Sequence, residues 1–99
     1  MVKSQIPNQF SLEQNYPNPF NPVTVIRYQI PAVGARYIVP VRLIIYNMLG
    51  QEVATLVDEV QEPGYKSVEW DASRQPSGVY VYRLTAEAFT DVKRMILIK

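Results

Sequence analysis

The stretch SGVYVYRLTA, residues 77–86, carries the alternation that decides the fold. Its even-numbered side chains from Tyr80 to Ala86 are apolar or aromatic, whereas the charged Arg83 stands among the odd-numbered ones. Successive side chains of a β-strand point to opposite faces, so the pattern predicts a strand with one face inside. Gly78 is typical of a tight turn, because glycine adopts positive φ without steric cost. The stretch therefore indicates a half-buried strand that leaves a turn.

Short runs of β-branched and aromatic residues recur along the chain, at a spacing typical of β-sandwiches and barrels. We expect strands at residues 23–30, 41–47, 52–57, 65–70, 79–86 and 92–98, with a weaker strand at 9–12. Residues 53–60 have mixed spacing, and their β-branched side chains favour a strand over a helix. Two antiparallel sheets packed face to face would bury the apolar sides of about seven such strands.

Glycine-containing turns separate several of these runs, at residues 48–50, 62–64 and 76–78. We expect each turn to join antiparallel neighbours. Alternation against the charged positions predicts which side chains face inward. The predicted inward residues are Ile26, Tyr28, Ile30, Val41, Leu43, Ile45, Val68, Trp70, Tyr80, Tyr82, Leu84 and Ala86.

The segment NYPNPFNP, residues 15–22, contains three prolines and so lacks three backbone donors. It is unsuited to a central strand, and we expect it to run extended along a sheet edge with Tyr16 and Phe20 on the core. There the prolines would blunt the edge, and the asparagines would hold the turns. The alternative, a polyproline ligand for an aromatic groove, is disfavoured because the PxxP spacing is absent.

The composition narrows the classes of function. The 99-residue chain is one domain without Cys or His, so a Ser-His or Cys-His nucleophile and a zinc site of the usual ligands are excluded. The net charge is +1 and the basic residues are scattered, which predicts no nucleic-acid partner. Its apolar runs are too short for a spanning helix or a signal peptide, so we expect no membrane insertion, and if the chain is exported we expect it to be a piece of a longer protein. The lack of Cys fits the cytosol and an exported bacterial domain equally.

Carboxylates occur in two groups that merit comparison with known sites. Glu69 and Asp71 share the outer face of one predicted strand, but an acid-base pair also needs a cleft and one raised pKa. Asp58, Glu59 and Glu62 fall in a predicted loop without the dense ligand order of a calcium site. We therefore expect no catalytic residue, no metal site and no cofactor.

Six blocks follow one another in an order that resembles the C-terminal sorting domains of type IX (Por) secretion substrates. The blocks are NYPNPFNP, VTVIRYQIP, VRLIIYNMLGQEVATLVDE, PGYKSVEWDA, SGVYVYRL and VKRMILIK. The resemblance covers residues 10–99 and leaves 1–9 as an N-terminal linker. It implies an all-β, immunoglobulin-like antiparallel β-sandwich. The longer segment at residues 32–40 departs from the family's short turn and hints at a bulge or a small extra edge strand.

The resemblance also implies a function and partners. Such a domain directs an N-terminal cargo domain across the outer membrane of a Bacteroidetes-type bacterium, to the cell surface or the extracellular space. Its partners would be the outer-membrane secretion translocon and, in some proteins, a sortase-like surface peptidase. The positions that match the family's signal elements are Pro76, Gly78, Val79, Tyr80, Tyr82, Arg83, Lys93, Met95, Ile96, Leu97, Ile98 and Lys99.

Partner recognition would fall to the signal positions that stay exposed. We expect these to be Gly78, Arg83, Lys93, Arg94 and Lys99, since the inward tyrosines serve the core. The last predicted strand is apolar on both faces, so we expect it to be central, covered, or read by a receptor through edge pairing.

Two other functions stay open on the sequence alone. An accessory structural or carbohydrate-binding module of a secreted enzyme would show a row of exposed aromatics, for which Tyr37 and Tyr65 are the only candidates. An assembly domain of the flagellar hook-capping type shares the fold and would come from a longer protein with further domains after it.

Overall fold

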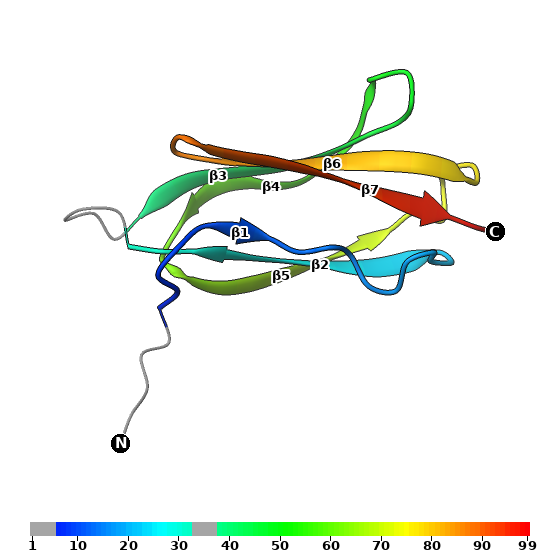
Figure 1. The fold of residues 1–99 in the computed structure, drawn as a ribbon. Coiled ribbons are helices and arrows are strands. Elements are labelled where there is room, and N and C mark those ends of the chain that lie inside the picture. Colours follow the sequence, from blue (N-terminus) through cyan, green and yellow to red (C-terminus); the bar gives the residue numbers. More distant parts are fainter. Residues whose placement is uncertain (1–5, 33–37) are drawn as a thin grey trace.

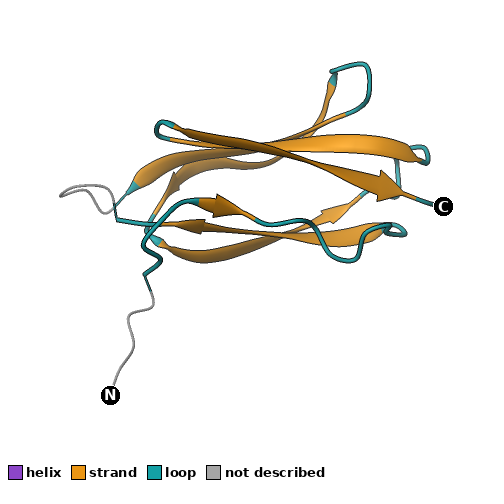
Figure 2. Ribbon diagram, viewed as in Figure 1, coloured by secondary structure: helices purple, strands orange, loops and turns teal. Residues whose placement is uncertain are grey.

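The computed structural model describes residues 6–32 and 38–99 of the chain. The described residues form seven strands joined by loops, with no helix among them (Figure 2). The strands are β1 (Ser11–Leu12), β2 (Val23–Ile30), β3 (Val39–Tyr46), β4 (Glu52–Gln61), β5 (Gly64–Asp71), β6 (Gly78–Ala86) and β7 (Phe89–Leu97). The predicted all-β class is confirmed.

The strands form two antiparallel sheets that face each other as the layers of a sandwich (Figure 1). One sheet has the order β1-β2-β5, and the other has the order β4-β3-β6-β7. At one side of the sandwich β1 contacts β7 across the layers, and we call this the front edge. At the other side β4 and β5 end their sheets without pairing with each other, and we call this the back edge.

The observed strands are longer than the sequence patterns predicted, except for β1 and β2. β4 continues to Gln61, so Asp58 and Glu59 belong to a strand and not to a loop as predicted. β7 begins at Phe89, because the chain turns tightly at Glu87, whose φ is 54°. β3 begins at Val39, whereas residues 33–37 of the predicted insertion lie outside the described residues.

The prediction that all three glycine turns join paired strands is correct only for the first. Gly50 has a φ of 81° and closes the β3–β4 hairpin, where the Gly50 amide donates to the Asn47 carbonyl at 3.0 Å. The turns at residues 62–64 and 76–78 instead carry the chain from one sheet to the other. A glycine turn signals a reversal of direction, and it does not specify which sheet the next strand joins.

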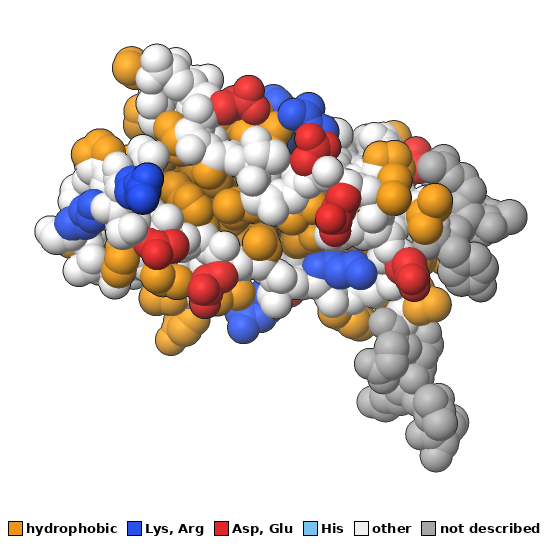
Figure 3. Space-filling model, turned by 180° about the vertical axis from the view of Figure 1, so that it is seen from behind, with side chains coloured by type: hydrophobic (Ala, Val, Ile, Leu, Met, Phe, Trp, Pro, Cys, Tyr) orange, Lys and Arg blue, Asp and Glu red, His pale blue; other side chains and the backbone are white. Residues whose placement is uncertain are grey.

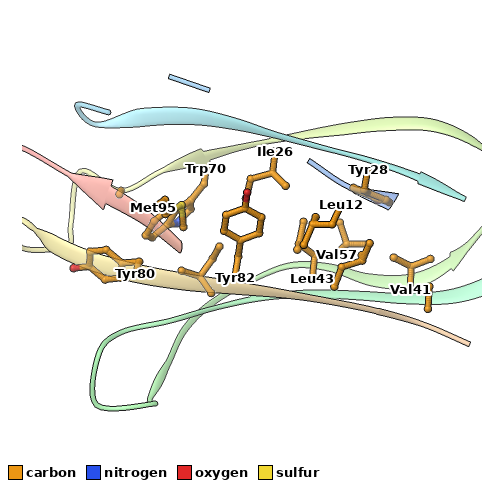
Figure 4. Packing of buried hydrophobic residues seen from close by; sticks show 14 of the residues in the cluster. Leu12, Ile26, Tyr28, Val41, Leu43, Val57, Trp70, Tyr80, Tyr82 and Met95 are labelled. Carbon is orange, nitrogen blue, oxygen red and sulfur yellow. The ribbon is translucent and has the colours of Figure 1, made fainter. Parts of the chain in front are cut away.

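The core lies between the sheets and is built from the side chains that alternation places inward (Figure 4). All predicted inward residues are buried except Val68, which is half-buried beside the back edge. Each large buried side chain contributes about 1.5–3 kcal/mol before chain entropy is subtracted. Ile44 is an exception to alternation, because it is buried on the outer side of its sheet, where it lies opposite Arg83.

The proline-rich segment runs along the front edge, as expected, and we call residues 13–20 the strap. Phe20 is buried and stacks at a tilt on Trp70, with 5.8 Å between the ring centroids. Tyr16 contradicts the prediction, because 73% of it is exposed to solvent. The Tyr16 backbone forms a bridge to Val25, which holds the strap beside β2 and leaves the side chain pointing away from the core.

The strap also covers the free edge of β7. The Phe20 amide donates to the Ile96 carbonyl and the Ile98 amide donates to the Phe20 carbonyl, each at 2.9 Å. Asn18 Oδ1 accepts the Ile96 amide at 2.9 Å. Further along, Gln14 Nε2 donates to the Arg94 carbonyl at 2.6 Å. The last strand, which is apolar on both faces, is therefore an edge strand and not a central one. Its edge is covered by the strap.

Candidate recognition surface

The outer side of β6 and β7 carries six side chains in three cross-strand pairs. The pairs are Val79 with Ile96, Val81 with Arg94, and Arg83 with Val92. Residues directly opposite each other on antiparallel strands point to the same face, so the six form one continuous patch. We call this patch the outer β6–β7 face. Its composition is four aliphatic residues and two arginines.

This face exposes more apolar surface than a half-buried strand pair requires. Val92 is 49% exposed and Ile96 is 41% exposed. Two hollows open on the face, one of about 390 Å³ beside Arg94 and Ile96 and one of about 430 Å³ beside Arg83 and Val92. The second hollow is also lined by the β3–β4 hairpin, whose Met48 is exposed. Exposed apolar surface that is contiguous and bordered by polar groups is typical of interaction sites.

The two arginines give the face its charge. The Arg83 guanidinium lies over the Tyr46 ring, with Cζ 5.0 Å from the ring centroid, and Nη2 donates to the Tyr46 hydroxyl. Arg94 stands beside the first hollow. Within residues 6–32 and 38–99, neither guanidinium is within ion-pair distance of a carboxylate. Both positive charges are therefore available to an external anion.

The other three residues predicted to contact a partner lie apart from this patch. Gly78 begins β6 opposite Leu97, at the end of the sheet. Lys93 belongs to the other side of β7, where its ammonium lies 3.9 Å from Asp91. Lys99 is held against the loop before β6, where its amide donates to Ser77 Oγ at 2.9 Å and its ammonium donates to the Ser73 carbonyl. The structure thus brings together only Arg83 and Arg94.

A buried polar cluster links the strap to β6, and the sequence patterns did not identify it. The Tyr82 hydroxyl accepts the Asn15 amide at 2.8 Å and donates to the Glu13 carbonyl at 2.7 Å. Asn15 Nδ2 donates to Thr24 Oγ1 at 3.0 Å, and the Thr24 hydroxyl donates to the Pro17 carbonyl at 2.9 Å. Burial raises the pKa of Tyr82 to about 12, because the anion would lose its hydration. The sequence signal that could have predicted this cluster is the pair Asn15 and Thr24, two polar residues that flank the prolines.

The remaining candidates from the sequence do not assemble into a reaction centre or a ligand site. Glu69 and Asp71 are exposed on the outer face of β5. No group of His, Cys, Asp or Glu able to hold a metal ion occurs in the part of the chain that the structure describes. Tyr65 is exposed on β5, whereas Tyr37 lies outside the described residues. Among those same residues, no helix is long and apolar enough to span a membrane.

The two sheets, the covered front edge and the exposed outer β6–β7 face define an antiparallel β-sandwich domain with a surface suited to interaction. The chain matches the family model of the secretion system C-terminal sorting domain over residues 14–99. It therefore belongs to that family, and it is a C-terminal sorting signal for type IX secretion. Neither the curated proteins nor the solved structures include a significant match.

Membership in the family carries further consequences. The domain belongs with a larger cargo protein and with the secretion machinery that exports it, and the destination is the cell surface or the extracellular space. The carbohydrate-binding alternative is not favoured by this match.

Proposed function

We propose that the outer β6–β7 face is the surface by which the outer-membrane secretion translocon recognises this sorting domain. The observation that carries the proposal is that exposed aliphatic residues on the last two strands lie beside two guanidiniums, neither of which has a carboxylate within ion-pair distance among the described residues. Apolar contacts provide the affinity of such an interface. The arginines orient the domain on its partner by pairing with acidic residues of the partner surface. In this proposal Gly78, Lys93 and Lys99 contact the partner separately, because they lie apart from this face.

The host in this proposal is a Bacteroidetes-type bacterium, in which a sortase-like surface peptidase acts after export. Residues 10–99 are the folded sorting unit, and residues 1–9 are the linker to the N-terminal cargo domain. The strap anchors the start of this unit to the final strand, and the described N-terminal residues lie at the end of the sandwich away from Lys99 (Figure 1). Cargo attached there would leave the outer β6–β7 face uncovered.

The domain acts in this proposal as an address and performs no catalysis. The tyrosines with raised pKa values, Tyr28, Tyr80 and Tyr82, owe them mainly to burial in the core. Each hydroxyl is also engaged in a structural hydrogen bond. Such groups hold the sandwich together and are unavailable as acids or bases for an external substrate.

Export of a reporter tests the proposal. We expect a periplasm-targeted reporter fused to residues 1–99 to reach the medium or the cell surface of a host with a type IX system. Removal of residues 93–99 should block export, whereas an Asp58→Asn variant should be exported normally. Reporter found only in the periplasm with the intact domain would overturn the sorting assignment.

A charge-reversal pair tests the face itself. We expect Arg83→Glu/Arg94→Glu to retain the reporter in the periplasm. The matched control is Arg27→Glu/Arg74→Glu, which makes the same change in net charge at exposed sites away from this face. Circular dichroism and urea unfolding of the isolated chain establish that both variants fold. Equal export of the two variants would remove the outer β6–β7 face from recognition.

A further inference from the structure

The free edges of the two sheets differ in how they are protected against pairing with another strand. The edge of β7 is covered by the strap, and β1 has only two residues. The pairing of β4 with β3 contains two register shifts, between Leu43 and Ile44 and between Ile45 and Tyr46. Short strands, bulges and covering segments are established ways of blocking edge pairing. Three of the four edges are thus protected.

The fourth edge, that of β5, is regular. β5 pairs with β2 over eight consecutive positions without a register shift, and it contains no proline. The Ala72 amide donates to the Pro22 carbonyl, so the amides of even-numbered residues point toward β2. By alternation, the amides of Ser67 and Glu69 point to the free side of the strand. Within the described residues no strand occupies that side.

An apolar seam runs beside this free edge. Ala54 and Leu56 on β4 and Val68 on β5 are half-buried and pack against the core. Because β4 and β5 do not pair, these side chains remain partly open to solvent between the layers. Seen from behind, the molecule shows hydrophobic side chains across its middle, with carboxylates above and below them and some Lys or Arg side chains among the carboxylates (Figure 3).

The charge around the seam is strongly negative. Residues 52–71 hold six of the nine acidic residues of the chain and one lysine, which gives that segment a net charge of −5. One of these carboxylates, on Asp58, lies 3.7 Å from the Arg42 guanidinium, and the Asp71 carboxylate accepts the Ser73 amide. Glu69 is exposed in the centre of the free part of β5. A cationic partner would therefore find complementary charge along β4 and β5.

We propose that β5 accepts an extended, basic and apolar segment of another polypeptide as an added strand at the back edge. Its backbone pairs with Ser67 and Glu69, and its inward side chains cover Val68 and Leu56. Its outward Lys or Arg side chains lie beside Glu69, at the distance of about 5 Å that separates cross-strand neighbours. The inward Lys66 limits the added strand to residues 67–71, because a charge on the inner face opposes further pairing.

A second copy of this chain does not meet the same requirements. Pairing of two β5 strands would bring the carboxylates of two acidic segments, residues 52–71 of each copy, together, and like charges on opposed strands are destabilising. The β7 strand is basic and apolar, but its backbone is already engaged by the strap. The occupant is therefore a separate cationic segment.

A capped eight-residue peptide of alternating Val and Lys is the probe. Titrated into the ¹⁵N-labelled 99-residue chain, it should shift the amide signals of Ser67 and Glu69 and slow their hydrogen exchange. The affinity should fall as salt is raised, since the charges are exposed. A peptide of alternating Val and Glu should produce no shifts. Shifts centred on β6 and β7 with the basic peptide would overturn the proposal.

Two variants locate the contact. Glu69→Lys should weaken binding about threefold or more, from loss of an opposite-charge pair and gain of a like-charge one. The matched control, Glu13→Lys on the strap, makes the same change in net charge and should bind as the parent. Ser67→Pro removes one outward amide without touching the bonds to β2, and it should abolish the slowed exchange.

Three outcomes would reject strand addition at β5. They are equal binding by Glu69→Lys and Glu13→Lys, undiminished binding by Ser67→Pro, and concentration-dependent dimerisation of the free chain in sedimentation. The last outcome would mean that a second copy occupies the edge. Unfolding curves for Ser67→Pro accompany the titration, and Glu69→Lys, which leaves the backbone unchanged, decides the outcome if Ser67→Pro is destabilised.

Discussion

The front and back edges of this sandwich are closed to different degrees. At the front, the strap places Phe20 in the core and bonds it to Ile96 and Ile98 on β7. At the back, β4 and β5 lie without mutual pairing, and Leu56 and Val68 stay half-buried. The front edge joins residues almost eighty positions apart, whereas at the back edge the turn at residues 62–64 carries the chain from β4 directly to β5.

The contrast shows that one fold can protect its edges by unrelated means. The front edge is closed by hydrogen bonds and a buried aromatic, which contribute to stability as well as blocking access. At the back edge the bulges protect β4 alone, and the carboxylates of β4 and β5 discourage pairing with a second copy of the chain without filling the seam. We therefore expect substitutions at the front to lower the free energy of unfolding more than equivalent ones at the back.

The largest expected effect comes from removing the buried anchor of the strap. Phe20→Ala should lower the free energy of unfolding by about 3–5 kcal/mol, because a buried aromatic side chain is lost and a cavity is left. Urea unfolding followed by Trp70 fluorescence measures the change, since the two rings are in contact.

The matched change at the back edge is Leu56→Ala. Its side chain is only half-buried, so we expect a loss of about 1 kcal/mol. Equal losses for the two variants would show that the two edges are equally closed, and the distinction drawn between them would fail.

An effect smaller than that of Phe20→Ala should follow from Tyr82→Phe, which keeps the ring and removes the hydroxyl. The Asn15 amide and the Glu13 carbonyl would each lose their partner, at a cost of about 1–3 kcal/mol. Hydrogen exchange at the Asn15 amide should accelerate in the variant. Tyr80→Phe is the comparison, because it loses one hydrogen bond, to the Pro76 carbonyl, away from the strap.

The same hydroxyl makes stability depend on alkaline pH. Burial raises the pKa of Tyr82 to about 12, above the value of about 10 for a free phenol. The folded protein therefore retains the proton longer than the unfolded chain. The contribution of the protonated Tyr82 hydroxyl to the free energy of unfolding is fully present below about pH 10. It is lost as the pH rises toward about 12, because the unfolded chain ionises first. Tyr82→Phe should show a shallower decline over this interval, and identical profiles would refute the assignment.

The smallest expected effect comes from uncovering one position of β7. Asn18→Ala removes the side-chain oxygen that accepts the Ile96 amide, at a cost of about 0.5–1.5 kcal/mol. Exchange of the Ile96 amide should become faster while that of the Trp70 amide, which points toward β2 in the back-edge strand, stays the same. A parallel change at both amides would indicate global destabilisation and not local opening of the front edge.

The alternation of residues predicted most of the core, because inward and outward positions in a strand are determined locally. Tyr80, Tyr82, Leu84 and Ala86 face inward as the pattern requires. The position of Tyr16 was not predictable in this way, since a large aromatic beside prolines is equally compatible with burial and exposure. For the proposed recognition surface, sequence reasoning selected Arg83 and Arg94, but it grouped them with residues that lie elsewhere in the structure.

The sequence by itself determined the all-β class, because strand periodicity and turn residues act over a few positions, and the order of its six blocks carried the resemblance to the sorting-domain family. Only the tertiary structure decided which strands are neighbours and which edges are covered. The contact of the strap with β7 depends on packing between residues that are distant in sequence, such as Phe20 and Leu97. No local pattern encodes that contact, because it forms only when both sheets are in place.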